Sequence, residues 1–171
     1  VKINHSVMEL LCAKHLIVKG YDVFVEHHLS DLLVCDLYGT KGDGRAIVEV
    51  ETGFVPPEHA LDPSGYLRAR TVSKIARYST FSDKFTLGTP PYSLLSIYSM
   101  FQKPPRYRSR EEIDEVKRLC DKYYMNPPIT AKEIAEARLH SIFLIDVDRL
   151  CVREVDPDAY ADIVLNAAGL T

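Results

Sequence analysis

Three carboxylates interrupt two apolar runs near the start of the chain. In the segment DLLVCDLYGTKGDGRAIVEVETG, residues 31–53, Asp36 lies in the first run, and Glu49 and Glu51 lie in the second. Acidic side chains are disfavoured inside strands and costly to bury without a partner. Clustered carboxylate oxygens suit a hard divalent cation, so these residue types predict a site for Mg²⁺ or Mn²⁺.

The glycine-rich sequence TKGDG between the two runs predicts an antiparallel hairpin. With the turn centred on Gly42–Asp43, Asp36 lies directly opposite Glu49. Val34 then lies opposite Glu51, and because side chains alternate along a strand, the three acids share one face of the hairpin.

The other face of the predicted hairpin is apolar. It carries six small or aliphatic side chains: Leu33, Cys35, Leu37, Ala46, Val48 and Val50. A slip of one residue would turn the acids into this core surface, so the alternation predicts one register.

Like charges that face each other across a sheet are destabilising, so the acids require a compensating cation. Two explanations are open from the pattern. The acids bind a divalent metal ion, or they lie on a solvated face where Lys and Arg side chains pair with them.

Two further features bear on this choice. A predicted second helix carries Arg70, Lys74 and Arg77 at helical spacing, which forms a basic stripe directly after the acidic strand. In the first helix, Ser6 and Glu9 fit a capping box, which would explain Glu9 without any further role. Apolar neighbours on its flank nevertheless direct Glu9 toward the protein body.

The elements that must position these side chains follow the order α-β-β-β-α-β. We expect a helix, three strands, a helix and a strand over residues 6–19, 21–29, 31–39, 45–51, 65–81 and 84–90. The last three elements imply a right-handed crossover within one sheet. Beyond them we expect helices over 93–101, after Ser109 and after Thr130, and a strand pair over 141–155 that turns at Asp148–Arg149.

Composition is that of one globular domain over residues 1–171, with a core at about 6–90 and additions at 91–171. The chain is 46% hydrophobic and 26% charged, with a net charge of -3, so any nucleic-acid contact must come from local basic patches. No apolar run reaches the length of about 18 residues that a membrane span needs, and no secretory signal is visible. Four scattered cysteines indicate a reduced, intracellular, cytoplasmic protein, although a disulfide between distant cysteines stays open.

With these residues in this order of elements, the chain resembles the PD-(D/E)XK nuclease superfamily, above all its Holliday-junction-resolvase and RecB-like branches. Asp36 matches the motif aspartate, Glu49 the (D/E) position and Glu9 the helix acid, while Lys74 or Arg77 matches the basic helix position. Small archaeal and archaeal-virus nucleases look similar. The resemblance implies an α/β fold with a restriction-endonuclease-like αβββαβ core, a central mixed sheet flanked by helices, and C-terminal helices and a strand pair.

The chain departs from that family at Glu51, which stands where a lysine is usual. Some restriction endonucleases of the superfamily also carry Glu there and remain active, and others have the lysine on the neighbouring helix, which would be Lys74. The change is also compatible with a lost activity. On the resemblance we favour Glu51 as a metal-site residue with Lys74 assisting.

The resemblance implies metal-dependent hydrolysis of DNA phosphodiester bonds, on branched DNA or in viral or archaeal recombination, repair or replication, by a homodimer in the cytoplasm (of the host cell for a viral protein). The expected catalytic residues are Asp36, Glu49, Glu51 and Lys74, and the expected ligands of Mg²⁺ or Mn²⁺ are Glu9, Asp36, Glu49 and Glu51. The expected DNA contacts are Arg68, Arg70, Lys74, Arg77, Arg106 and Arg108.

Three alternatives remain open. The first is a protein of this fold that binds DNA without cutting it, and the second is an acidic α/β domain whose basic helix merely pairs with the acids. The third, metal binding at His27 and His28, is disfavoured because adjacent strand residues point to opposite faces. The basic segment KPPRYRSR, residues 103–110, is equally compatible with a DNA contact and with a plain surface loop.

Overall fold

The computed structural model describes the backbone of residues 2–170 and the side chains of residues 5–170. Its centre is a six-stranded sheet in which the strands lie side by side in chain order. The strands are β1 (Asp22–Ser30), β2 (Leu33–Lys41), β3 (Gly44–Val50), β4 (Lys84–Thr89), β5 (Ser141–Asp146) and β6 (Cys151–Val155). β3, β4 and β5 run parallel and the other neighbours run antiparallel, so the mixed sheet expected from the sequence is confirmed.

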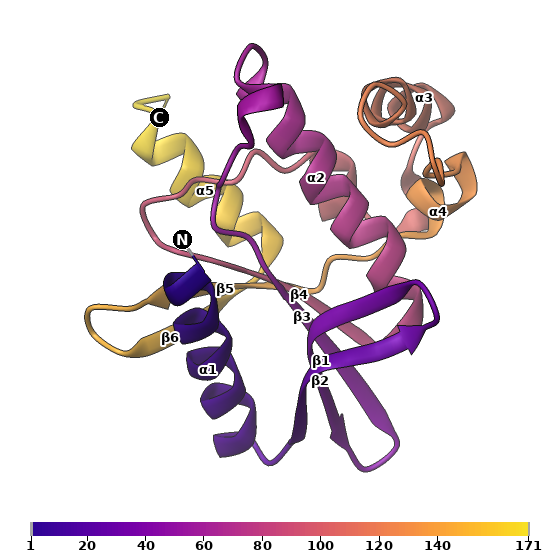
Figure 1. Ribbon diagram of the computed structural model, residues 1–171. Coiled ribbons are helices and arrows are strands. Elements are labelled where there is room, and N and C mark those ends of the chain that lie inside the picture. Colours follow the sequence, from indigo (N-terminus) through magenta and orange to yellow (C-terminus); the bar gives the residue numbers. More distant parts are fainter. Residues whose placement is uncertain (1, 171) are drawn as a thin grey trace.

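Helices cover both faces of the sheet (Figure 1). They are α1 (Lys2–Val18), α2 (Pro63–Tyr78), α3 (Arg110–Cys120), α4 (Ala131–Glu136) and α5 (Pro157–Ala167). α1 packs on one face, and side chains of α2, α3, α4 and α5 join the core on the other face. The element order predicted for residues 6–90 is present, as are the predicted crossover helix and closing strand pair.

Alternation along β3 divides the core into two layers. Val48 and Val50 face α1, where they pack with Met8 and Cys12. Ile47 faces α2 and packs in a second cluster that contains Phe85 and most of the buried side chains of the C-terminal half. Glu49 follows on that second face, at the end of the strand, which places a carboxylate at the border of the larger core layer.

The register predicted for the hairpin is confirmed, because β2 and β3 pair Leu37 with Val48 and close at Lys41 with Gly44. The predicted facing of Val34 and Glu51 is wrong. β2 pairs with β3 only as far as Leu37, and beyond that residue it pairs with β1 alone.

Because the far end of the β1–β2 ribbon is released from β3, it curves toward the end of α2, where Tyr78 Oη donates a hydrogen bond to the Val34 carbonyl at 2.9 Å. Cys35 therefore packs in the larger core layer and not beside Leu37, contrary to the single apolar face that strict alternation predicts.

Two expectations about helices were wrong, and one helix was not foreseen. α1 begins at Lys2, so Ser6 lies inside the helix and is no cap, and Glu9 is free of a capping role. Residues 93–101 contain no α-helix and only the first three residues of a short 3-10 turn at Ser99–Gln102. The Leu95 amide donates to Tyr160 Oη at 2.8 Å and not to a helical carbonyl. α5, capped by Asp156 with proline at its first position, was not foreseen.

The capping residues predicted for the two later helices are confirmed, since Ser109 and Thr130 both form complete capping boxes. Across the described residues, no helix is both long enough and apolar enough to span a membrane. All four cysteines are free thiols, which settles the open question of a disulfide; Cys12, Cys35 and Cys120 are buried and Cys151 is exposed.

The layered core gives a stability prediction. Phe85 lies on β4 and is fully buried in the core layer that faces α2. Phe85→Ala should therefore lower the free energy of unfolding by about 3–5 kcal/mol. Leu61→Ala is the control, because Leu61 is fully exposed and should change stability by less than about 0.5 kcal/mol. Urea unfolding monitored by circular dichroism measures both, and equal midpoints would contradict this packing.

Candidate metal centre

Asp36 and Glu49 meet at the fork where β2 leaves β3. The Asp36 amide donates a hydrogen bond to Glu49 Oε1 at 2.8 Å, and the Val50 amide donates one to Asp36 Oδ2 at 2.7 Å. Each carboxylate therefore accepts a hydrogen bond from the opposite strand, at the position where the backbone ladder stops. This exchange fixes both side chains in orientation. Asp36 and Glu49 are close together, as predicted, but they lie beyond the last ladder pair, Leu37 with Val48.

Lys74 of α2 points into the same fork. Its Nζ lies 2.6 Å from the Val50 carbonyl oxygen, 3.3 Å from Glu49 Oε2 and 3.8 Å from Asp36 Oδ2. Its side chain is only 13% exposed, and Glu49 is almost fully buried. Two carboxylates and one carbonyl thus converge on a single cationic atom, which is the arrangement of oxygen ligands around a metal ion.

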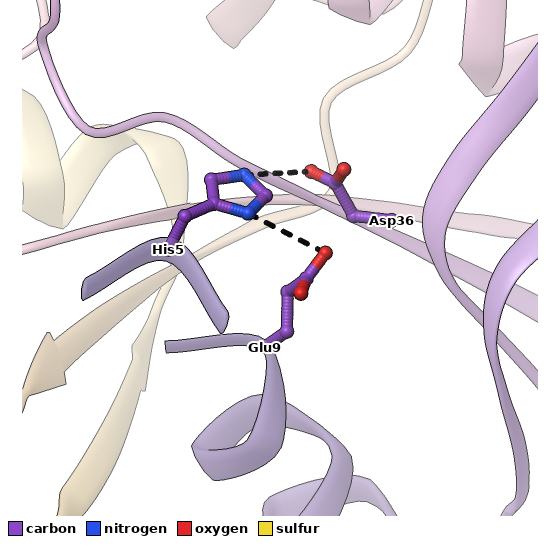
Figure 2. A group of neighbouring side chains, drawn as sticks. All are labelled: His5, Glu9 and Asp36. Atoms are coloured by element: carbon purple, nitrogen blue, oxygen red, sulfur yellow. Dashed lines mark ion pairs between the residues drawn. The ribbon is translucent and has the colours of Figure 1, made fainter. Parts of the chain in front are cut away.

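Two side chains of α1 complete the cluster, as Figure 2 shows. His5 Nδ1 lies 3.5 Å from Glu9 Oε1, and His5 Nε2 lies 3.7 Å from Asp36 Oδ2. One potential ligand atom from each of His5, Glu9 and Asp36 lies within 4.8 Å of the other two. Because imidazole favours transition metals, this set favours an ion such as Mn²⁺ over Mg²⁺ more than carboxylates alone would.

His5 was missed by the sequence reasoning. His5 and Glu9 are four residues apart and share one face of α1, which is a signal for a joint site. Placing the helix start at Ser6 left His5 outside the helix and hid the relation. Figure 2 shows both side chains pointing from α1 toward Asp36.

Burial shifts the acid–base properties of this cluster. Desolvation raises the pKa of Glu49 to about 7; the Lys74 charge opposes that shift and the Asp36 charge adds to it. Desolvation also raises the pKa of Glu9, where His5 opposes the shift and the charges of Asp36 and Glu26 add to it. Glu49 and Glu9 therefore keep a proton to a higher pH than solvent-exposed carboxylates do.

Glu26 is a further acid near the centre that the sequence reasoning did not single out. It lies on β1 between Val25 and His27, whose partners are Leu37 and Cys35, so it is adjacent to Asp36 across the ribbon. Its backbone has φ of 50°, a left-handed conformation that is uncommon outside glycine and asparagine.

Glu51 lies apart from the His5, Glu9 and Asp36 group. Its side chain is fully buried, and Oε1 accepts a hydrogen bond from the Gly53 amide at 3.0 Å. Oε2 lies 2.9 Å from Arg70 Nε in an ion pair that is not aligned as a hydrogen bond. Glu51 thus has its own cation, and the pair anchors the chain as it leaves β3.

The acids are therefore paired with Lys and Arg side chains, which agrees with part of the second explanation offered from the sequence. The pairs are not on a solvated face, however. Glu49 and Glu51 are both buried, and a buried charge is costly unless it is neutralised at close range.

The basic side chains predicted to contact DNA have varied surroundings. Arg70 and Lys74 face the acids, as described above. Arg77 Nη2 points away from them and donates to the Pro127 carbonyl at 2.7 Å. The guanidinium of Arg68 stacks 4.1 Å from the ring centroid of Tyr98.

In the segment 103–110, Arg108 is held by backbone carbonyls. It donates to those of Met100, Lys103, Ile134 and Ala135. Arg106 is exposed and lies over the ring of its neighbour Tyr107. Of the two arginines, Arg106 is the one whose guanidinium is open to a ligand.

Comparisons with protein-family models, curated proteins and solved structures find no match to this chain. The functional argument therefore rests on the geometry of the site and on the motifs of the sequence.

The raised pKa of Glu49 predicts how stability depends on pH. Between pH 4.5 and about 7 the native state binds a proton at Glu49 that the unfolded chain has lost. In EDTA, therefore, this residue should make the melting temperature fall as the pH rises from 5 to 8, and Glu49→Gln should flatten that fall.

Asp83→Asn is the matched control, since Asp83 is a surface carboxylate paired with Arg45 and its pKa is lowered by that arginine. Scanning calorimetry of the three proteins across this pH range measures the difference. Parallel curves for the wild type and Glu49→Gln would show that Glu49 does not carry the shift.

Proposed function

We propose that the protein is a metal-dependent DNA endonuclease whose centre consists of His5, Glu9, Asp36 and Glu49. The observation that carries the proposal is the convergence of Asp36, Glu49 and the Val50 carbonyl on one cation, the Lys74 ammonium. The same oxygens are the ones that a divalent ion would take, and His5 and Glu9 lie on the open side of Asp36.

The residues of the fork fit a divalent ion for two reasons. Asp36 and Glu49 are fixed in orientation by the reciprocal hydrogen bonds across the strands. Ion binding would therefore cost little further side-chain conformational entropy. Their opposed negative charges also favour a cation between them. The ion, Mn²⁺ or Mg²⁺, would polarise a phosphate oxygen and lower the pKa of a bound water.

The chain's own residues have distinct roles in this proposal. Asp36 and Glu49 bind the ion, with Glu9 and His5 as ligands from the helix side. Lys74 reaches the same oxygens from α2, so it is positioned to stabilise negative charge on the phosphate undergoing attack. Glu51, held by Arg70, positions the chain after β3 and supports Val50.

DNA as the substrate rests on the resemblance of the motifs to PD-(D/E)XK nucleases, and the α-β-β-β-α-β order of the first elements supports it. The migrated lysine of that family corresponds here to Lys74, which lies beside both motif acids. Branched DNA is the substrate form we favour, with a homodimer supplying two centres for cleavage of both strands.

A second candidate function is DNA binding without cleavage. It is favoured by one observation, namely that Lys74 already neutralises the two acids and contacts the Val50 carbonyl. In such a protein the lysine would serve as a permanent substitute for the metal.

Cleavage separates the two candidates. The protein should nick supercoiled plasmid and cut branched DNA in Mn²⁺ or Mg²⁺, and EDTA should stop both reactions. Asp36→Asn should lower the single-turnover rate by at least about 10²-fold, as loss of a directly acting group does. Asp83→Asn should retain full activity, because Asp83 lies on the surface beside Arg45. Cleavage in excess EDTA, or an active Asp36→Asn protein, would refute the proposal.

Substitutions of Lys74 and Glu51 should differ in their effect on Mn²⁺ affinity. Lys74→Gln should bind Mn²⁺ more tightly than the wild type, because Asp36 and Glu49 lose their cation, yet should cleave about 10²–10³-fold more slowly. Glu51→Gln should leave Mn²⁺ affinity nearly unchanged, because Glu51 lies against Arg70.

Arg77→Gln is the control on the same helix, since its side chain points to Pro127 and should alter neither quantity strongly. Calorimetric Mn²⁺ titration and single-turnover kinetics measure both properties, with circular dichroism to verify folding. A larger loss of Mn²⁺ affinity in Glu51→Gln than in Lys74→Gln would reverse these assignments.

A further inference from the structure

A cavity of about 680 Å³ lies between residues 101–108 and residues 138–140. Its volume is within the range of small-molecule sites. None of its lining residues belongs to the candidate metal centre. One of them, His140, directly precedes β5, and its amide donates to the Phe85 carbonyl at 2.9 Å. The inference below therefore does not depend on the metal centre, although Arg106 and Arg108 are also among the DNA contacts expected from the sequence.

Positive charge is concentrated around this cavity. Four cationic side chains line it: Lys103, Arg106, Arg108 and Arg138. Lys103 pairs with Glu112, and Arg108 donates to neutral carbonyls, which do not cancel its charge. Burial and the nearby charge of Arg138 lower the pKa of Arg108 to about 10, as expected where positive charge is not fully offset.

Two of these cations are open to a ligand. Among the described side chains, 5–170, neither Arg106 nor Arg138 forms an ion pair with a carboxylate. Arg106 contacts only the ring of Tyr107, and Arg138 is held through its backbone amide, which donates to Ser79 Oγ at 3.0 Å. Both guanidinium groups are exposed at the cavity.

His140 adds a neutral donor of defined direction. Its Nδ1 accepts a hydrogen bond from the Phe85 amide at 2.9 Å, so the ring proton of the neutral imidazole is on Nε2. Burial, together with the charges of Arg138 and Lys84, lowers the pKa of His140 and keeps the ring neutral. The free N–H of a residue that lines the cavity is therefore available to an acceptor there.

The remaining lining is apolar and includes Phe101, Leu139 and two prolines. Guanidinium groups match the oxygens of a phosphate, and an apolar wall suits a flat ring attached to it. We propose that this cavity binds the phosphate group of a nucleotide or of a nucleic-acid strand, with Arg106 and Arg138 pairing with its oxygens and His140 donating from Nε2.

Binding measurements test the proposal. The probes are a fluorescently labelled ATP and a labelled single-stranded oligonucleotide with a 5′-phosphate, both in EDTA so that no cleavage occurs. We expect saturable binding of at least one probe that weakens with added salt. Arg138→Gln and Arg106→Gln should each weaken it at least about tenfold, the loss expected when one charge-assisted contact of about 1.4 kcal/mol or more is removed.

Arg149→Gln is the matched control, because Arg149 is equally an exposed arginine but pairs with Asp146 at the turn between β5 and β6. Tighter binding of the oligonucleotide than of the nucleotide would identify a strand as the ligand, and the reverse would identify a nucleotide. No saturable binding of either probe at low salt, or equal losses in Arg149→Gln and Arg138→Gln, would overturn the proposal. The nuclease proposal would be unaffected by either result.

Discussion

The reciprocal hydrogen bonds between Asp36 and Glu49 are the interaction on which the candidate centre depends. At the end of the β2–β3 ladder, each carboxylate accepts a backbone N–H from the opposite strand, so the two strands separate without leaving these amides unpaired. The opening lets Lys74 enter from one side of the sheet and brings Asp36 within reach of α1 on the other. A site built from β2, β3, α1 and α2 is possible because the strands part at this residue.

Charge is balanced at this fork in a way that stability alone does not explain. Glu49 and Lys74 are both largely buried, as are Glu51 and much of Arg70. Buried ion pairs rarely add net stability relative to apolar side chains of the same volume, because each charge must first lose its water. Stability alone therefore does not account for two such pairs on neighbouring turns of one helix, which supports the proposed cation-binding role.

The sequence was informative where one strong periodicity decided the outcome. Alternation in the hairpin predicted the register, and the capping residues Ser109 and Thr130 predicted two helix starts. It failed where a local signal competed with tertiary packing. Ser6 has the residue type of a cap but lies within a longer helix. Residues 93–101 have helical spacing, but the Leu95 amide donates to Tyr160 and the segment forms no α-helix. The contact partners of the arginine side chains could not be predicted either. An arginine side chain carries five N–H donors, but its residue type does not specify which carbonyl or aromatic ring it will contact.

The order of strands in the sheet determines how much of the chain must be synthesised before the sheet can form. β4 is a central strand, and one of its edges is filled only by β5, which follows more than fifty residues later (Figure 1). Until β5 has been synthesised, a chain ending near residue 90 presents an open strand edge and leaves Phe85 and Leu87 without much of their core. On this basis we expect that the αβββαβ segment, which carries the candidate site, does not fold by itself. Parallel pairing over such a separation is slow to form, so the nascent N-terminal half is the species most exposed to aggregation during synthesis.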